Sequence, residues 1–470
     1  MSATAVPALF ANGLRSGKSN FTIKIKVMKR LLLSISICAS FFTGGYGQEL
    51  SLRECIEMGI ERNLSLHRCD ISTDIANNRL SENRSKLLPV LDANFQFTDF
   101  LMRPTNVTTG ALLGSDFSDD PTWQQIRSMQ YGVNAGIQMS MPVFNKSIFS
   151  GIDVAKTLVN ISRISTEQAK EELIVAIANT YYLAQASNEQ ASLLQDNIKR
   201  MQELCEITQS MYEGGVVMEI DLSRVRINIS NIEAMRKQYA TIYEQQLNLL
   251  RFLLDIAPEQ NISVIKMDES LTLTVVNGVS DNLPELRLIN ERKELIDRQI
   301  NTVRAGYLPS ISLFEQLGIN GYQDQFKGFF NDNKHHWFGN SFIGIKVNVP
   351  IFDANIKKKK INAYRLERAQ TDIMLEEHHK ALIRDYNNLS EKLELNISSF
   401  RVQKDNFAQA LSVFNVTEER YKEGVASMTD LLQDEMRMRE SQIACVHSLC
   451  ECNLAYVQLL KLSDNLKRLK

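Results

Sequence analysis

Few residues in this chain interrupt long regular elements, because its 470 residues include only 9 prolines and 21 glycines. Beyond the N-terminal region no run of about 18 apolar residues occurs, so the sequence predicts no membrane-spanning helix there. The 7 cysteines form no CxxC pair, the 6 histidines show no HExxH-type spacing, and no GxxxxGKS or GxxxxGKT loop is present. The sequence therefore predicts no enzyme, no cofactor and no metal site.

A basic and then apolar segment near the N-terminus is typical of an export signal. Met28-Lys29-Arg30 precede an apolar stretch that ends at Phe42, and small residues follow up to Gly47. We expect residues 28–47 to be a secretory signal peptide and residues 1–27 to be a non-native upstream extension. The alternatives are a short membrane anchor, for which the apolar stretch is short, and lipidation at Cys38.

Cleavage after Gly47 changes the charge of the chain. It removes six positive charges and no acid, so the formal net charge falls from −2 to −8. A mildly acidic mature chain predicts no nucleic-acid partner. We expect the six remaining cysteines to be small buried residues in helix seams, with one long-range disulfide as the alternative.

The mature chain contains an internal repeat. Three anchors recur in the same order at offsets of 208 to 209 residues, namely Pro142 and Pro350, Tyr212 and Tyr421, and Asp221 and Asp430. The sequence predicts a tandem duplication, with a first repeat at 48–255, a linker with a short strand in an equatorial region at 256–283, a second repeat at 284–465 and a tail at 466–470.

Four segments alternate between apolar and polar residues with a period of two. They lie at about 90–101, 130–141, 310–321 and 340–350, and Glu315 is an exception on an apolar side. Such alternation is typical of membrane strands with lipid on one face and water on the other, and also of a half-buried soluble sheet. Four strands cannot close a barrel, so the membrane interpretation requires several copies of the chain.

Two segments are long enough to form helices of roughly 100 Å. Residues 146–211 contain no proline and one glycine, and residues 354–421 contain neither. Gly214, Gly215 and Gly424 are expected to end these helices, and new helices are expected near Ile220 and Thr429. The sequence thus predicts two antiparallel helical hairpins, with tips at about 212–221 and 421–430.

These features together resemble the outer membrane efflux protein family of TolC-like outer membrane factors. The resemblance rests on the segment 52–63, on Leu-Pro ahead of two strands, on Pro-Val-Phe and Pro-Ile-Phe after the other two, and on Tyr-x-x-Gly before each hairpin aspartate. It implies a mainly α fold with a membrane β-barrel of four strands per protomer, twelve in the trimer. A long periplasmic α-helical coiled-coil barrel would continue this β-barrel.

The resemblance also implies a function. The chain would be a homotrimeric outer-membrane channel of a Gram-negative bacterium, with most of its mass in the periplasm. It would be a passive exit duct for small molecules delivered by an inner-membrane pump and a periplasmic adaptor, and outer-membrane lipid would surround it. The alternatives are type I protein secretion or metal export, and, in a different class, a soluble periplasmic coiled-coil scaffold.

The resemblance further implies residue roles. Asp430 matches the first aspartate of a periplasmic gate, Gln433 stands where a second aspartate is common, and Asp221 is the first-repeat equivalent. For both aspartates the alternative is a charge that stabilises a helix N-terminus. The expected barrel-to-helix junctions are Pro89, Pro142, Pro309 and Pro350. The basic run of Lys357, Lys358, Lys359 and Lys360 is expected either at lipid head groups or on a solvated helix face.

Overall fold

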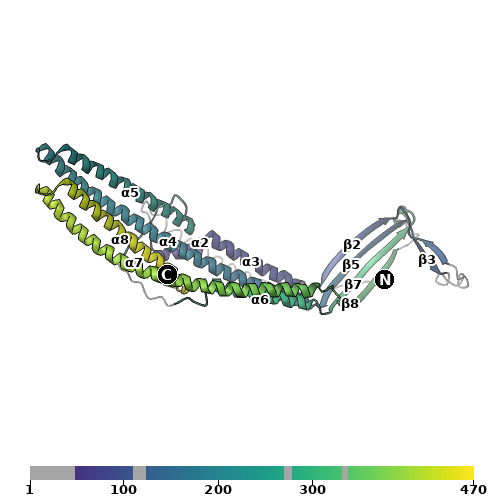
Figure 1. The fold of residues 1–470 in the computed structure, drawn as a ribbon. Helices are drawn as coiled ribbons and strands as arrows, with labels where there is room; N and C mark the ends of the chain where they lie inside the picture. The colour runs from purple at the N-terminus through teal and green to yellow at the C-terminus, as the bar shows by residue number, and fades with distance from the viewer. Residues whose placement is uncertain (1–47, 110–122, 269–277, 331–336, 470) are drawn as a thin grey trace, which may run out of the picture.

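The computed structural model describes residues 48–109, 123–268, 278–330 and 337–469. The molecule is elongated, with a sheet at one end and a long helical body at the other (Figure 1). The sheet is set at an angle to the helices where the two parts join. The predicted signal peptide and upstream extension lie outside the described residues.

The main sheet has four antiparallel strands in the order β2-β5-β7-β8. They are β2 (Val90–Asp99), β5 (Tyr131–Phe144), β7 (Ser310–Gln323) and β8 (Trp337–Asn348). Among the described strands, this order leaves one edge of β2 and one edge of β8 without a partner. The four predicted segments therefore form one sheet, in which the two halves of the repeat meet at the β5–β7 pair.

Several strand ends differ from the predicted ones. β2 ends at Asp99 rather than 101, β5 continues to Phe144, and β8 begins at Trp337. β5 passes through Pro142, where the register against β7 shifts. A proline cannot donate a ladder hydrogen bond, and such an irregularity near a strand end accommodates it.

The register gives the sheet one polar and one apolar face. Even-numbered positions form the polar face, where Asn94 donates to Asn134 (3.0 Å) and Asn134 donates to Asn320 (2.7 Å). Odd-numbered positions form the apolar face, with large exposed side chains at Leu91, Phe95, Ile137, Leu317, Ile343 and Ile345. Glu315 lies on this apolar face between Met139 and Ile343, yet β7 continues through it.

The connection between β2 and β5 contains a second strand pair that the sequence reasoning missed. β3 (Thr105–Thr109) pairs with β4 (Trp123–Arg127) and extends beyond the far end of the sheet (Figure 1). Only five residues contribute to each strand, and short runs of this kind give a weak sequence signal. In the other connection, the 3-10 helix η3 (Phe326–Phe330) contacts Phe97 and Tyr131, so its aromatic residues lie against the apolar face.

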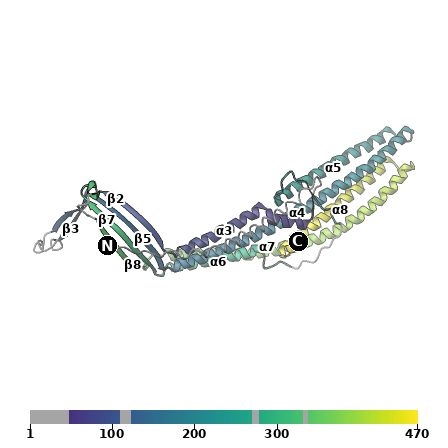
Figure 2. The same cartoon turned by 180° about the vertical axis from the view of Figure 1, so that it is seen from behind.

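The helical body is built from two long hairpins that lie side by side (Figure 2). One pairs α4 (Lys146–Glu213, 68 residues) with α5 (Glu219–Leu254), and the other pairs α7 (Ile356–Lys422, 67 residues) with α8 (Met428–Leu462). α4 follows β5 almost directly, because the side chain of Asn145 caps the helix by accepting from the N–H of Ser147. Both helices span close to the expected lengths.

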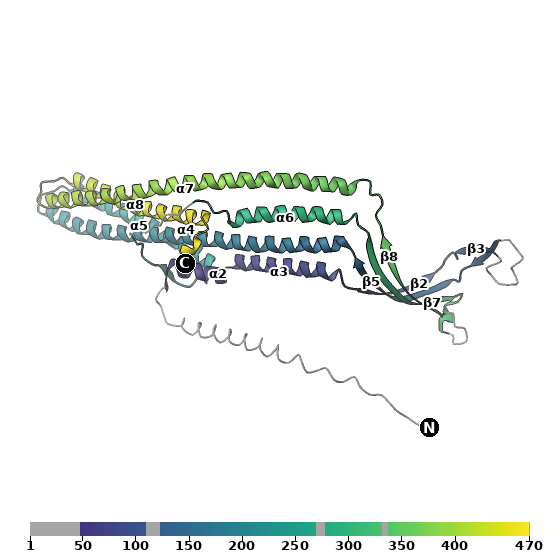
Figure 3. The same cartoon turned by 90° about the horizontal axis from the view of Figure 1, so that it is seen from below.

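Shorter helices complete the half of the body next to the sheet. They are α2 (Leu52–Arg62), α3 (Leu64–Ser85) and α6 (Pro284–Ala305), with α3 and α6 packed against α4 (Figure 3). Where α5 ends and α3 begins, β1 (Gln48–Leu50) pairs in parallel with β6 (Ile262–Val264). β6 is a short strand within the predicted linker, whereas the apolar stretch 271–276 lies outside the described residues. A 3-10 helix, η4 (Leu466–Leu469), follows α8.

Apolar seams between the helices hold the body together. One cluster lies where α2, α4 and α5 meet the small β1–β6 sheet, and another lies toward the hairpin tips. Leu194, Ile232 and Leu431 of the second cluster are fully buried. Each such side chain contributes about 1.5–3 kcal/mol relative to exposure. The cysteines at 55, 69, 205, 445, 450 and 452 are free thiols, and three of them are buried.

α8 differs from the expectation that no apolar helix of membrane-spanning length would follow the N-terminal region. An 18-residue window in it reaches a mean hydropathy of 1.3, which is enough by length and composition to cross a membrane. The helix packs against α7 and α4 along its length, and its buried positions include Leu449, Val457 and Leu460. This packing accounts for its composition as that of a core helix.

Candidate functional site

The two hairpin tips lie together at the end of the body farthest from the sheet (Figure 3). In the first tip, Val216 N–H donates to Met211 O (2.9 Å) and Gly215 N–H to Tyr212 O (3.0 Å). In the second tip, Val425 N–H donates to Arg420 O (2.8 Å) and Gly424 N–H to Tyr421 O (2.9 Å). This is the Schellman helix ending in both repeats.

In each tip, one glycine has a backbone conformation that favours glycine over other residues. Gly215 and Gly424 both have φ +75°, a left-handed conformation that costs other residues free energy. Gly214 is the C-cap residue of α4 with φ −78°, so it has an ordinary right-handed backbone. Of the three tip glycines predicted from the sequence, two are therefore essential to the turn geometry.

Asp430 lies in the first turn of α8 and is exposed. Ser427 is the N-cap residue: its hydroxyl accepts from the N–H of Asp430 (3.2 Å) and donates to the Asp430 carboxylate (2.6 Å). The helix N-terminus and this hydroxyl fix the carboxylate at the tip. Gln433 is also exposed and lies three residues on, on the same side of the helix. Asp434 instead accepts from Thr417 (2.8 Å) and is mostly covered.

Asp221 does not match Asp430 in its surroundings. Its side chain is 16% exposed and forms an ion pair with Arg224 (3.2 Å). The same guanidinium nitrogen of Arg224 donates to the Thr429 hydroxyl (3.2 Å), which lies in the other hairpin. The two tips are thus linked through Arg224, and the Asp221 charge is neutralised locally.

A buried polar cluster lies about two turns behind the second tip. Glu435 and Arg439 are 1% and 7% exposed, and Arg439 donates to Glu435 (3.2 Å). Asn228 of α5 donates to Glu435 (3.0 Å) and accepts from Arg439 (3.4 Å). Burial raises the pKa of the Glu435 carboxyl, while the hydrogen bond from Asn228 and the charge of Arg439 act in the opposite direction.

Sequence reasoning did not find this cluster. The only signal was Arg439, which interrupts the apolar stripe of α8. A lone charge on such a stripe does not reveal its partner, since Asn228 comes from a helix about 200 residues away in the sequence. Tyr421 and Thr208 form a further buried link between the hairpins, with their hydroxyl oxygens 3.3 Å apart.

The four predicted junction prolines all lie near the boundary between the sheet and the helices. Pro89 and Pro309 directly precede β2 and β7, Pro142 lies at the end of β5, and Pro350 follows β8 by two residues. Proline ends helical structure on its N-terminal side and favours extended backbone there. The chain therefore changes from helix to strand within a few residues at each junction.

The basic run forms the first turn of α7, immediately after the fourth junction. Lys357 is ion-paired with Asp353 (3.4 Å) and lies over the ring of Tyr307, whereas Lys358 and Lys359 are exposed. Lys360 lies near the ring of Tyr364. Cations at a helix N-terminus oppose the helix dipole, so local helix energetics do not explain the run.

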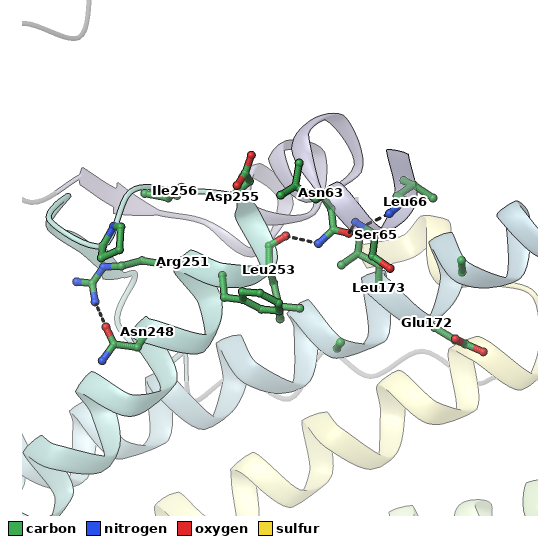
Figure 4. A pocket seen from close by; sticks show the side chains of 15 residues that line it. Asn63, Ser65, Leu66, Glu172, Leu173, Asn248, Arg251, Leu253, Asp255 and Ile256 are labelled. Carbon is green, nitrogen blue, oxygen red and sulfur yellow. Dashed lines mark hydrogen bonds between the residues drawn. The ribbon is translucent and has the colours of Figure 1, made fainter. Parts of the chain in front are cut away.

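A cavity with a volume of about 740 Å³ lies beside the break between α2 and α3 (Figure 4). Asn63 lies at the break, where its side chain accepts from the N–H groups of Ser65 and Leu66 and donates to Leu253 O (2.9 Å). Leu64 and Phe252 also line the cavity and are 68% and 76% exposed. The cavity thus opens on the side of the body where, among the described helices, α3 and α5 have no further neighbour.

Comparison with known proteins identifies the family. The family model described as "Outer membrane efflux protein" matches residues 56–255 and 276–462, which is most of the chain. The chain belongs to the outer membrane efflux protein family. This membership confirms three predictions, namely the family, the TolC-like fold class and the outer-membrane location.

Individual relatives are distant. The probable efflux pump outer membrane protein TtgC of Pseudomonas putida is 24% identical over 295 residues, or 60% of this chain and 59% of that protein. The match thus spans less than two thirds of that relative. Outer membrane protein TolC of Escherichia coli is 21% identical over 435 residues, covering 86% of this chain and 80% of that protein.

Solved structures show the same fold. The open state of the MtrE outer membrane channel of Neisseria gonorrhoeae superposes on this efflux-family protein with a TM-score of 0.70. The two chains are 21% identical, and the match covers 89% of this chain and 90% of the other. The names of TtgC and MtrE describe an efflux pump outer membrane protein and an outer membrane channel.

Proposed function

We propose that three copies of this efflux-family protein form one exit duct across the outer membrane. The observation that carries the proposal is the four-stranded sheet with two open edges and with faces of opposite polarity. An open sheet edge cannot face hydrocarbon, because its backbone N–H and C=O groups would be unpaired. Three times four strands gives twelve, an even number within the range of about 8 to 26 strands found in membrane barrels.

The polarity of the two faces supports a duct that holds water. Side-chain amides line the polar face on all four strands, at Asn94, Gln96, Asn134, Gln138, Gln316, Asn320 and Asn340. These groups hydrogen-bond readily to water and carry no charge. The apolar face, which carries exposed Leu, Ile and Phe side chains, suits contact with lipid.

The helical body would extend the duct into the periplasm. α4 and α7 are each roughly 100 Å long at 1.5 Å per residue. α4 begins at Lys146, directly after β5, and α7 begins at Ile356, a few residues after β8. In this proposal Lys358 and Lys359 contact lipid head groups at the periplasmic surface of the membrane. The run lies at the junction where head groups would be found, which supports this role over a solvated face alone.

We propose small molecules as the cargo, delivered by an inner-membrane pump through a periplasmic adaptor. The names of the relatives support efflux, since they describe an efflux pump outer membrane protein and an outer membrane channel. Energy for transport would come from the pump, so the chain would act as a passive, non-catalytic conduit.

The gate would lie at the hairpin tips, where three copies of Asp430 encircle the axis. Asp430 is exposed and fixed by its cap, and Gln433 lies beside it, so the ring would combine carboxylates with amides. A ring of carboxylates attracts cations, and a cation bound between them would hold the three tips together against the mutual repulsion of the carboxylates. Asp221 has a different role in this proposal, because its ion pair holds Arg224 toward Thr429 and so keeps the two tips together.

Single-channel recording in planar bilayers tests both parts. The detergent-extracted trimer should conduct and prefer cations, and Asp430→Asn should lose most of that preference while keeping a hydrogen-bonding partner for Ser427. Glu440→Gln, an exposed acid farther along α8, is the matched control and should leave selectivity unchanged. A conducting trimer with unaltered selectivity in Asp430→Asn would remove the gate role alone. A monomer that needs no detergent would overturn the duct.

A further inference from the structure

Two opposite charges stand alone on the polar face of the sheet, one on each edge strand. Asp92 is the third residue of β2, Lys346 is the third from the end of β8, and both are exposed. The other even-numbered positions of the four strands are uncharged. Within the described parts of the chain, neither Asp92 nor Lys346 has a hydrogen-bonding or ionic side-chain partner.

The backbone shows how these residues are placed at the open edges. Phe100 N–H donates to Gln130 O (2.9 Å), one step beyond the Asp99–Tyr131 pair. Even-numbered residues of β2 therefore direct their backbone groups to β5, and odd-numbered residues direct theirs to the open edge. The same alternation, carried through the register to β8, leaves the odd-numbered residues of β8 at its open edge.

This alternation restricts how the β8 strand of one copy can pair with the β2 strand of the next. Odd-numbered residues must oppose odd-numbered ones, so that both edges satisfy their hydrogen bonds. Asp92 and Lys346 then occupy non-hydrogen-bonded positions, where opposite Cα atoms approach to about 4.5 Å. Only even shifts in register remain possible.

Two of these registers pair every residue of β2, and they differ by a shift of two residues. One of them also includes the end of β8 nearest the helices, because it places Val90 opposite Asn348 and Asp99 opposite Gly339. In this register Asp92 lies directly opposite Lys346. On the apolar face, the same register pairs Leu91 with Val347 and Phe95 with Ile343.

Barrel geometry independently supports a shifted register of this size. Within one copy, Asp92 lies in a row with Gln138, Gln316 and Phe342, and Lys346 is four residues from Phe342 toward the helices. Four strands spaced about 4.8 Å apart and tilted by 35–45° shift the register by about 13–19 Å, which is about four to six residues. A shift of four makes Asp92 and Lys346 direct neighbours across the seam, and a shift of six makes them diagonal neighbours.

We propose that Asp92 of one copy pairs with Lys346 of the adjacent copy, and that this pair fixes the register of the seam between protomers. The inference rests on the proposed trimer and adds its assembly determinant. A register slip of two residues preserves the backbone hydrogen bonds and keeps each side chain on its face of the sheet, but it moves the two charges apart. The charge pair therefore favours one of the even-shifted registers over the others. The other residues of this face are uncharged amides, small residues and aromatic residues, and they would not do so.

Disulfide cross-linking of cysteine pairs identifies the register of the seam directly. After oxidation, D92C/K346C should yield a covalent trimer on denaturing gels, because non-hydrogen-bonded cross-strand positions suit a disulfide. D92C/F342C tests the unshifted register and D92C/N348C tests the shift of six, and both should cross-link far less. Oxidised wild-type protein controls for the native cysteines. Dominant cross-linking in either control pair would overturn the direct pairing.

Charge reversal tests whether the pair contributes to assembly. D92K and K346D should each lower the temperature at which the trimer dissociates in detergent, and D92K/K346D should recover most of the loss. Q316K places a charge on the same face of an interior strand and should have little effect. A trimeric wild type with no rescue in the double variant would overturn the inference alone, whereas a wild type that is not trimeric would overturn the proposed function.

Discussion

At the scale of single residues, the buried pair of Glu435 and Arg439 has the largest expected effect on stability. Both side chains are almost fully buried between the hairpins, and Asn228 bonds to each of them. Removing one member of a buried pair leaves the other charge without compensation, which costs about 3–5 kcal/mol. The cluster therefore couples the stability of the second hairpin to its contact with the first.

We expect Arg439→Met to destabilise the protein by about 3 kcal/mol, measured by thermal unfolding of the purified protein. Arg437→Met is the matched control, since Arg437 lies on the same helix but is 63% exposed. Its loss should change stability by less than about 0.5 kcal/mol. Equal melting temperatures for the two variants would show that the buried pair is not coupled as the geometry indicates.

Glu171, in the middle of α4, predicts a dependence of stability on pH. Burial raises the pKa of its carboxyl to about 7, and the nearby charge of Asp464 adds to the effect. The folded state therefore holds a proton that the unfolded state releases near its ordinary value of 4.5. The resulting stabilisation is fully present below about pH 4.5 and is lost as the pH rises through about 7.

Glu171→Gln removes this titration. The variant should match wild type near pH 4 and be more stable by about 1 kcal/mol at pH 8, a figure reduced to allow for partial exposure of the side chain. Denaturant unfolding at the two pH values measures the difference. A variant less stable than wild type at pH 8 would mean that the ionised carboxylate makes favourable contacts.

At the scale of elements, the helix endings show which glycines matter. Gly215→Ala and Gly424→Ala place a side chain at φ +75° and should each cost about 1 kcal/mol. Gly214→Ala should be neutral or slightly stabilising, because its backbone is right-handed and the nearest atom to an added Cβ is 3.4 Å away. Hydrogen exchange at the tips and thermal unfolding would separate the two classes. A loss in Gly214→Ala as large as that in Gly215→Ala would contradict this assignment.

Elements with a strong local signal could be predicted from the sequence. The four alternating segments and the two long helices have periods of 2 and 3.6 residues over many positions, and the glycines and prolines mark their ends. The β3–β4 ribbon has five residues per strand, too few for a clear period. The start of β8 at Trp337 was also missed, because strand ends depend on the partner strand rather than on local pattern.

The candidate site was less accessible to sequence reasoning. Asp430 and Gln433 could be predicted as neighbours because their spacing of three residues places them on one side of a helix. The contact between Arg224 and Thr429 could not, since these two residues come from different hairpins and meet only after folding. The same holds for Asn228, Glu435 and Arg439. Long-range polar contacts leave no periodic trace in a single sequence.

At the scale of the whole molecule, the two halves of the internal repeat have equivalent elements but different surroundings. The two halves contribute equivalent strands and hairpins, and they meet at the β5–β7 pair. Their surroundings differ: α3 and α5 lie along one side of the body and α7 along the other. The apolar cavity beside the α2–α3 break lies on the α3 and α5 side, and the proposed trimer would bring α7 of a neighbouring copy against it.

The unpaired margins of the sheet also have a consequence for biogenesis. Before it joins the proposed trimer, a newly exported copy would carry unpaired backbone groups at the edges of β2 and β8 and an exposed apolar face. Such edges can pair with other strands, so a single copy would be prone to aggregation or degradation. The yield of functional pores would therefore depend on the local concentration of copies and on any factor that covers these edges during transit.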